Sequence, residues 1–194
     1  MILLIFGVTN VGKTVTGEIL AKKLKYPFFD LDDEIRRKFH TTLEEFMKKN
    51  PWPYERAKVK GKVLREVIDN NGDNMVIAVS PIYYARKFNY LLQRENVIAV
   101  ELQDTKEHIF ERLVFSDEND QVYEDNEYKE THRDHYLREI REDIQYVKAT
   151  FSKIQWKYFV DNKSPEQAAE EIAQLFPEKI REKRASGIEY TQQE

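Results

Sequence analysis

The residues with the most evident chemistry lie near the start of the chain, in the stretch GVTNVGKT from Gly7 to Thr14. Two glycines five positions apart, followed by Lys and Thr, form the complete G-x-x-x-x-G-K-[ST] pattern. Because glycine has no Cβ, Gly7 and Gly12 allow backbone N–H groups to turn inward toward phosphate oxygens. A chance glycine-rich turn is the alternative. The apolar run before the pattern and the amphipathic segment after it favour phosphate binding.

The other positions of this loop fit the same chemistry. Lys13 supplies a compact positive charge to the β and γ phosphates, and Thr14 offers its hydroxyl to Mg²⁺. The helix that starts there favours negative charge at its N-terminus. We therefore predict that the loop binds a nucleoside triphosphate, ATP, together with Mg²⁺. The residues expected to contact the nucleotide here are Gly7, Asn10, Val11, Gly12, Lys13, Thr14 and Val15.

Asp30 and Asp32 form a second candidate group. They lie two residues apart at the end of a short apolar run, so their carboxylates leave the same face of a strand. Ligands of open parallel sheets bind beyond the carboxyl ends of the strands. One carboxylate could hold the water shell of Mg²⁺ while the other accepts a proton from a substrate hydroxyl. Alternatively, Asp32 or Asp33 caps the next helix, and Asp33 is the better candidate for a cap.

Arg56 is informative because of its position on a predicted helix. At 100° per residue it lies within about 20° of the line that Val63 and Val67 define. An arginine centred on an apolar stripe does not face bulk water, and its planar fork could bind a carboxylate of a ligand. An internal ion pair with one of the two aspartates is the alternative, and the two roles are compatible.

Short apolar runs alternate with longer helical patterns, which predicts a parallel sheet covered by helices on both faces. The expected strands are Ile2–Phe6, Phe28–Leu31, Met75–Ser80, Val97–Leu102 and Tyr158–Val160. The expected helices are Thr14–Lys25, a short one through Leu43 and Phe46, one from Pro53 to about Asp69, one from about Tyr128 to Thr150, and one from Pro165 to Phe176.

Composition limits the class of protein. The 194 residues predict one domain over residues 1–177 and a polar tail over 178–194. A net charge of −4 gives no overall attraction to nucleic acid or anionic membranes. The chain has no cysteine, which excludes disulfides and thiolate chemistry. We expect a cytoplasmic protein without a signal peptide or membrane span. The sequence does not distinguish a monomer from a homodimer.

The opening GVTNVGKTVTGEILAKKLKYPFFDLDDEIRR resembles that of shikimate kinases. The similarity continues through TTLEEFMKKNPWPYERAKV and, more loosely, VDNKSPEQAAEEI. It implies an α/β fold of nucleoside-monophosphate-kinase type, with five parallel strands in the order 2-3-1-4-5. It also implies ATP- and Mg²⁺-dependent phosphotransfer to a small molecule, with shikimate the leading acceptor. The alternatives are a kinase for a nucleoside, nucleotide or sugar-like acceptor, and a catalytically lapsed nucleotide-binding regulatory module.

The resemblance also implies roles for single residues. Asp30 takes part in metal binding, Asp32 is the base that faces the substrate, and Arg56 clamps the substrate carboxylate. Arg112 matches an arginine beside the adenine, although an ordinary surface arginine is the alternative. The expected catalytic residues are thus Lys13 and Asp32, the metal ligands Thr14 and Asp30, and the substrate contacts Asp32, Arg56 and Ser80.

The chain departs from the family pattern on the acceptor side. Val79-Ser80-Pro81-Ile82-Tyr83 replaces a Gly-Gly-Gly turn, although Ser80 could still donate to a hydroxyl or phosphate oxygen. Val59 replaces a glutamate that braces the substrate arginine. The expected lid, about 116–135, begins with an acidic part, Ser116–Thr131, that has seven acids and no arginine, and which we interpret as an exposed loop. A lid arginine would then come from Arg133, Arg138 or Arg141, and the identity of the acceptor stays open.

Overall fold

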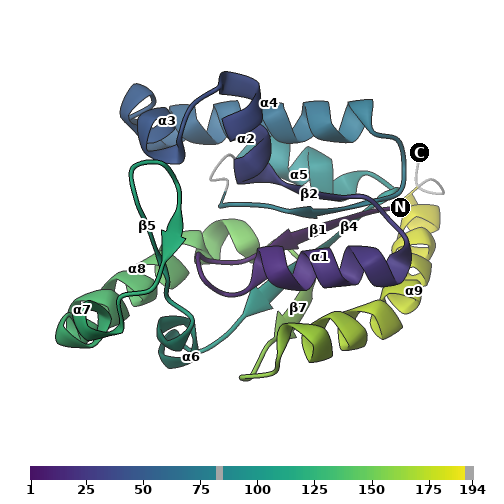
Figure 1. Ribbon diagram of the computed structural model, residues 1–194. Helices are drawn as coiled ribbons and strands as arrows, with labels where there is room; N and C mark the ends of the chain where they lie inside the picture. Colours follow the sequence, from purple (N-terminus) through teal and green to yellow (C-terminus); the bar gives the residue numbers. More distant parts are fainter. Residues whose placement is uncertain (82–84, 191–194) are drawn as a thin grey trace.

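A five-stranded parallel sheet forms the centre of the computed structural model, which describes residues 1–81 and 85–190 (Figure 1). The strands lie in the order β2-β3-β1-β4-β7. Since β7 is the fifth strand of this sheet along the chain, the predicted order 2-3-1-4-5 is confirmed. The strands are β1 (Ile2–Phe6), β2 (Phe28–Asp30), β3 (Met75–Ala78), β4 (Val97–Gln103) and β7 (Trp156–Phe159).

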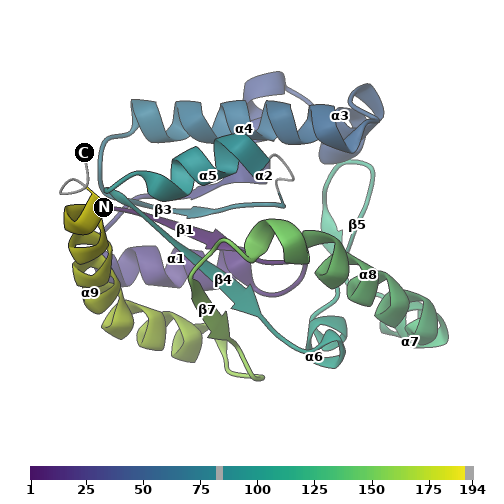
Figure 2. The same cartoon turned by 180° about the vertical axis from the view of Figure 1, so that it is seen from behind.

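Helices cover both faces of this sheet, with α1 and α9 on one face and α5 and α8 on the other (Figures 1 and 2). The helices are α1 (Lys13–Leu24), α2 (Leu31–Phe39), α3 (Leu43–Lys49), α4 (Pro53–Asn70), α5 (Ala85–Gln93), α6 (Lys106–Glu111), α7 (Asn126–Thr131), α8 (Arg133–Phe151) and α9 (Pro165–Tyr190). None of the helices in the described part of the chain is both long and apolar enough to cross a lipid bilayer.

The core lies on both faces of the central strands. Every residue of β1 and β3 is buried, as expected for strands that read as unbroken apolar runs. Gly17 brings α1 close to this sheet, because a Cβ there would lie 2.6 Å from Cε2 of Phe28 in β2. This close packing sets the start of α1 beside the end of β2, where the two groups of candidate residues meet.

The acidic segment differs from the exposed loop that we predicted. β5 (Phe115–Ser116) and β6 (Val122–Tyr123) pair as an antiparallel hairpin. Asp117 closes its turn, since Oδ1 accepts the amides of Asn119 and Gln121, each over 2.8 Å. The helix expected after this segment is also divided, at His132, into α7 and α8.

The end of the last helix was predicted wrongly. α9 continues past the expected end at Phe176 and runs to Tyr190, with Pro177 inside it. Proline removes one helical hydrogen bond and bends a helix, and α9 is visibly curved (Figure 1). The helix continues because Ile180 packs against the core and Lys183 donates a hydrogen bond to the carbonyl of Leu92.

Candidate active site

The loop between β1 and α1 has the backbone that the glycine pattern predicts. Gly7 and Gly12 have φ angles of 148° and 103°, and Asn10 has a φ of 61°. A Cβ on Gly7 would lie 2.7 Å from both the carbonyl oxygen of Leu102 and Cγ1 of Val11. A larger residue would therefore clash at Gly7, and the left-handed φ of Gly12 is strained for any other residue.

The start of α1 suits a polyphosphate. Gly12 is the N-cap residue and provides no side-chain cap for the helix. The first amides of a helix have no partner within it, and the helix dipole favours an anion at this end. Thr14 and Val15 are exposed here. This geometry suits contacts of these residues with a nucleotide, and those contacts stay predictions.

Lys13 turns back into its own loop, where Nζ donates to the carbonyl oxygen of Val8 over 2.8 Å. Burial lowers the pKa of Lys13 to about 8, and the neighbouring carboxylates of Asp32 and Asp30 offset only part of this effect. The ammonium of Lys60 lowers the pKa further. A phosphate in the loop would replace the Val8 carbonyl and stabilise the charged form.

We expect the affinity for MgADP to fall as the pH rises above about 8, because Lys13 then loses its proton in the free protein. Binding of the anionic nucleotide must restore that proton, so proton uptake should accompany binding. Calorimetry at about pH 7 and about pH 9, in buffers with different ionisation enthalpies, measures both quantities. Equal affinity at the two pH values, without proton uptake, would contradict this prediction.

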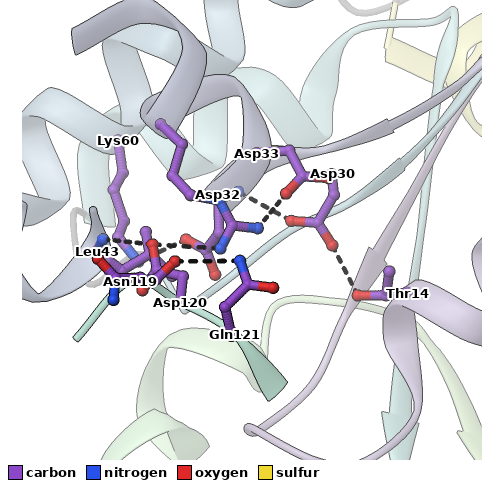
Figure 3. A network of polar contacts seen from close by, with 10 residues as sticks. Thr14, Asp30, Asp32, Asp33, Leu43, Lys60, Asn119, Asp120 and Gln121 are labelled. Carbon is purple, nitrogen blue, oxygen red and sulfur yellow. Dashed lines mark hydrogen bonds and ion pairs between the residues drawn. The ribbon is translucent and has the colours of Figure 1, made fainter. Parts of the chain in front are cut away.

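The two predicted carboxylates lie beside the glycine loop (Figure 3). Thr14 Oγ1 donates to Asp30 Oδ2 over 2.6 Å, and the amide of Asp32 donates to Asp30 Oδ1 over 2.9 Å. Asp30 is therefore the N-cap of α2. The prediction that Asp33 is the cap was wrong, because the helix begins earlier, at Leu31, and the Asp33 carboxylate instead pairs with Arg36.

Thr14 and Asp30 offer the oxygen ligands that Mg²⁺ prefers. Burial raises the pKa of Asp30, and a bound divalent cation would stabilise the carboxylate form. Within the described residues, no cluster of three His, Cys, Asp or Glu side chains could hold a metal ion by itself. The site therefore fits Mg²⁺ that arrives with nucleotide phosphates and gains few protein ligands, as is usual for this ion.

Lys60 lies in the same cluster as the carboxylates of Asp30 and Asp32, although sequence reasoning missed it (Figure 3). Its Nζ lies 3.2 Å from Asp32 Oδ1 and 2.8 Å from Ser80 Oγ. Lys60 follows Arg56 by one helical turn on α4, so both side chains leave the same side of the helix. This i,i+4 spacing was the signal that could have identified Lys60.

Arg56 makes different contacts from those considered for it. Its guanidinium donates to the carbonyl oxygens of Asn50 and Pro51, over 3.1 and 3.0 Å. These carbonyls end α3 and lead into α4, so Arg56 fixes the turn between the two helices. The ion pair with an aspartate that was the alternative for Arg56 is made by Lys60 instead, which pairs with Asp32. The substrate contact of Arg56 remains a prediction.

Arg112 lies against the glycine loop at the end of α6. Its Nε donates to the carbonyl oxygen of Asn10 over 3.4 Å, and its NH2 group donates to Asp104 Oδ2 over 2.6 Å. Burial alone would raise the pKa of Asp104, but hydrogen bonds from Arg112, His108 and the Thr105 amide keep it below the usual value. Asp104, which the sequence analysis did not identify, thus holds Arg112 beside the glycine loop. Contact with the base stays a prediction.

The acidic hairpin reaches across to α2 and α3 (Figure 3). At its tip, Asp120 Oδ2 accepts the amide of Leu43 over 2.8 Å and lies 3.3 Å from Arg36 NH1. Asp125 caps α7 by accepting the amide of Tyr128 over 2.9 Å. Several of the seven acids therefore have structural partners: Asp120 holds the hairpin against α3, and Asp125 caps α7.

We expect Asp120→Ala to loosen the hairpin from α3 without unfolding the protein. The change removes an acceptor that is only 10% exposed, at a cost of about 1–3 kcal/mol. Hydrogen exchange of the Leu43 amide and limited proteolysis of residues 116–123 should both become faster. Glu118→Ala, an exposed acid in the same hairpin, is the control. Equal rates in the two variants would show that Asp120 does not hold the hairpin.

The remaining acceptor-side candidates are only partly described. Ser80 is buried at the end of β3, whereas Ile82 and Tyr83 lie outside the described residues. Arg133, one of the arginines considered for the lid, already has two partners. Its Cζ lies 4.5 Å from the centre of the Phe110 ring, and its NH1 lies 3.0 Å from Glu130 Oε2. Arg138 and Arg141 are exposed on α8.

Comparison with known protein sequences points to one family. The family model described as "Shikimate kinase" matches residues 9–177. A shikimate kinase from Persephonella marina is 24% identical over 166 residues, which cover 86% of this chain and 93% of that protein. A pentafunctional AROM polypeptide from Schizosaccharomyces japonicus is 33% identical over 75 residues, or 39% of this chain. That match spans only 5% of the length of the polypeptide.

Solved structures of shikimate kinases share the fold of this chain. Shikimate kinase from Bacteroides thetaiotaomicron has a TM-score of 0.74 and 19% identity, with 91% of this chain and 98% of that chain covered. Shikimate kinase from Acinetobacter baumannii, solved in complex with shikimate, has a TM-score of 0.71 and 21% identity, with 91% and 93% covered. At these low sequence identities, the similarity shows that the fold is shared.

Proposed function

The chain belongs to the shikimate kinase family, and from this premise we propose that it transfers the γ-phosphoryl group of ATP to a hydroxyl of a small metabolite. Shikimate is the leading acceptor, since one structure of similar fold is that of a shikimate kinase bound to it. ATP is the expected co-substrate and Mg²⁺ the expected cofactor. We propose no nucleic acid or membrane partner.

The observation that supports this proposal most is the direct connection between the glycine loop and the carboxylates. Thr14, in the loop, lies 2.6 Å from Asp30, and Asp30 in turn accepts the amide of Asp32 over 2.9 Å. A phosphate in the loop and an alcohol beside Asp32 would therefore be neighbours. This adjacency is what an in-line transfer requires.

In the proposed reaction, the acceptor oxygen attacks the γ phosphorus while the bond to the β–γ bridging oxygen breaks and ADP leaves. Asp32 accepts the proton of the acceptor hydroxyl. Lys13 moves from the Val8 carbonyl to the phosphates and stabilises their charge. Thr14 and Asp30 would hold Mg²⁺, which would supply further neutralisation of the phosphate charge.

The test is an assay of the purified chain with MgATP and shikimate, followed by ³¹P NMR of the products. We expect ADP and a phosphate ester of shikimate in equal amounts, and no reaction when Mg²⁺ is chelated. ADP formed without a shikimate ester would exclude shikimate as the acceptor. Failure to phosphorylate any hydroxylated acceptor would leave the nucleotide-binding regulatory module as the better explanation.

A second candidate function is the same transfer to another hydroxylated acceptor, such as a nucleoside, nucleotide or sugar-like compound. Ser80 and Pro81 favour it, because they stand where the family has glycines that let shikimate approach the backbone. Their side chains leave less room for a ring at that place. A panel of these acceptors in the same assay distinguishes the two candidates.

A further inference from the structure

We propose that a cavity between α2, α3 and α4 is a second ligand site, separate from the candidate active site, and that it binds a small aromatic anion. The inference goes beyond the proposed function. Among the described residues that line the cavity, none has a role in the proposed phosphotransfer. The cavity can therefore hold its ligand while a nucleotide and an acceptor occupy the site at Asp32.

The first argument is the size and lining of the cavity. The three helices lie together on one side of the molecule (Figures 1 and 2). The cavity between them has a volume of about 410 Å³, which is within the range of small-molecule sites. It combines apolar, polar and cationic side chains: Phe39, Phe46, Val59 and Val63, then Thr41 and Asn50, then Lys38, Lys49 and Lys62.

The cavity lies on a different side of α4 from the carboxylates. Lys60 and Lys62 are 200° apart at 100° per residue, so their side chains leave nearly opposite sides of the helix. Lys60 extends to Asp32, whereas Lys62 lines the cavity. On α2, Asp32 lies in the first turn and Lys38 lies near the end, about 9 Å further along the helix axis. A ligand in the cavity is thus distinct from an acceptor beside Asp32.

The second argument is the excess of positive charge. Three lysines line the cavity, and none of the described lining residues carries a carboxylate. Lys38 pairs with Glu66, and Lys49 Nζ lies 3.6 Å from Glu45 Oε2. Lys62 is exposed and makes no ion pair within the described part of the chain. The cavity therefore keeps one uncompensated ammonium, which favours an anionic ligand.

The third argument is the aromatic surface inside the cavity. The rings of Phe39 and Phe46 stack, with their centres 5.9 Å apart and their planes at 26°. Phe46 is buried, whereas Phe39 is 42% exposed, so the Phe39 ring can stack on a further ring. Lys38 Nζ lies 5.9 Å from the centre of the Phe39 ring. A ligand ring that stacks on Phe39 would thus bring an attached acid group close to an ammonium.

The experiment measures binding of 1-naphthoate, an aromatic carboxylate, to the wild-type protein by calorimetry. Two further probes each lack one feature: 1-naphthalenemethanol has the rings without the charge, and acetate has the charge without the rings. We expect 1-naphthoate to bind at least about 10-fold more tightly than either. Its affinity should not change when MgADP and shikimate are present, because neither compound occupies the cavity.

Three lysines of α4 locate the probe. Lys62→Met should weaken binding of 1-naphthoate about 3- to 10-fold, and Lys62→Glu should weaken it further because the charge is reversed. Lys58→Met is the matched control, since Lys58 is 56% exposed on the same helix and does not line the cavity. Lys60→Met is the control for the candidate active site. Neither control should change the affinity for 1-naphthoate.

Several results would overturn the inference. Wild-type protein that does not bind 1-naphthoate, or binds the alcohol or acetate equally well, would show that the cavity does not select an aromatic anion. Displacement of 1-naphthoate by MgADP or shikimate, or weaker binding by Lys60→Met, would place the probe in the candidate active site. Equal affinities of Lys62→Glu and wild-type protein would exclude the cavity as its site. The proposed function is tested separately, by phosphotransfer.

Discussion

We expect Asp32→Asn to lower kcat of the phosphotransfer by about 10²- to 10⁴-fold while the affinity for MgADP stays nearly unchanged. The amide has the same size as the carboxylate but cannot accept a proton from the acceptor. Its oxygen can still accept a hydrogen bond from Lys60. The backbone amide of residue 32 keeps its bond to Asp30, so the start of α2 should not change.

The control for this variant is Asp33→Asn, because Asp33 is adjacent and its carboxylate is 60% exposed and paired with Arg36. Initial rates at saturating MgATP and acceptor give kcat, and calorimetry gives the nucleotide affinity. An equal loss of kcat in both variants would indicate a general disturbance of α2. Full turnover by Asp32→Asn would remove this residue from the mechanism.

The sheet could be predicted from the sequence because its signals are local. Each central strand is an apolar run buried on both faces, and the chain returns to the sheet through a helix after each run. The glycine loop was predictable for the same reason. The φ angles of Gly7 and Gly12 belong to a short segment whose conformation depends on few distant contacts.

The partner of Asp32 could not be predicted because helical periodicity gives the side of a helix but not the reach of a side chain. Arg56 and Lys60 leave the same side of α4. Arg56 finds acceptors in the preceding turn, at Asn50 and Pro51, whereas Lys60 extends to Asp32 and Ser80. This choice depends on the tertiary position of α3, which no local pattern specifies.

The hairpin was missed for a related reason. Seven acids in a short stretch are typical of a solvated loop, and the two strands are only two residues long. What fixes the segment is the bond from the Leu43 amide to Asp120, 77 residues further along the chain. Composition describes the average environment of a segment, so it cannot show that one of its acids is held by a distant helix.

We expect Lys13→Met to lower kcat by about 10³-fold or more and to keep or raise the free energy of unfolding. The first effect follows from losing the charge that stabilises the phosphates. The second follows because burial lowers the pKa of Lys13 to about 8. That shift corresponds to roughly 3 kcal/mol of cost for the charged form, more than the ~1 kcal/mol of the hydrogen bond to Val8.

Urea unfolding at neutral pH and initial-rate kinetics measure the two effects of Lys13→Met. Lys22→Met, an exposed lysine of the same helix, should change neither quantity. If Lys13→Met were both inactive and clearly less stable than wild type, Lys13 would be a structural residue and its loss of activity would follow from a damaged loop. Inactivity with undiminished stability would instead mean that the folded chain bears the cost of a buried charge because phosphate binding requires it.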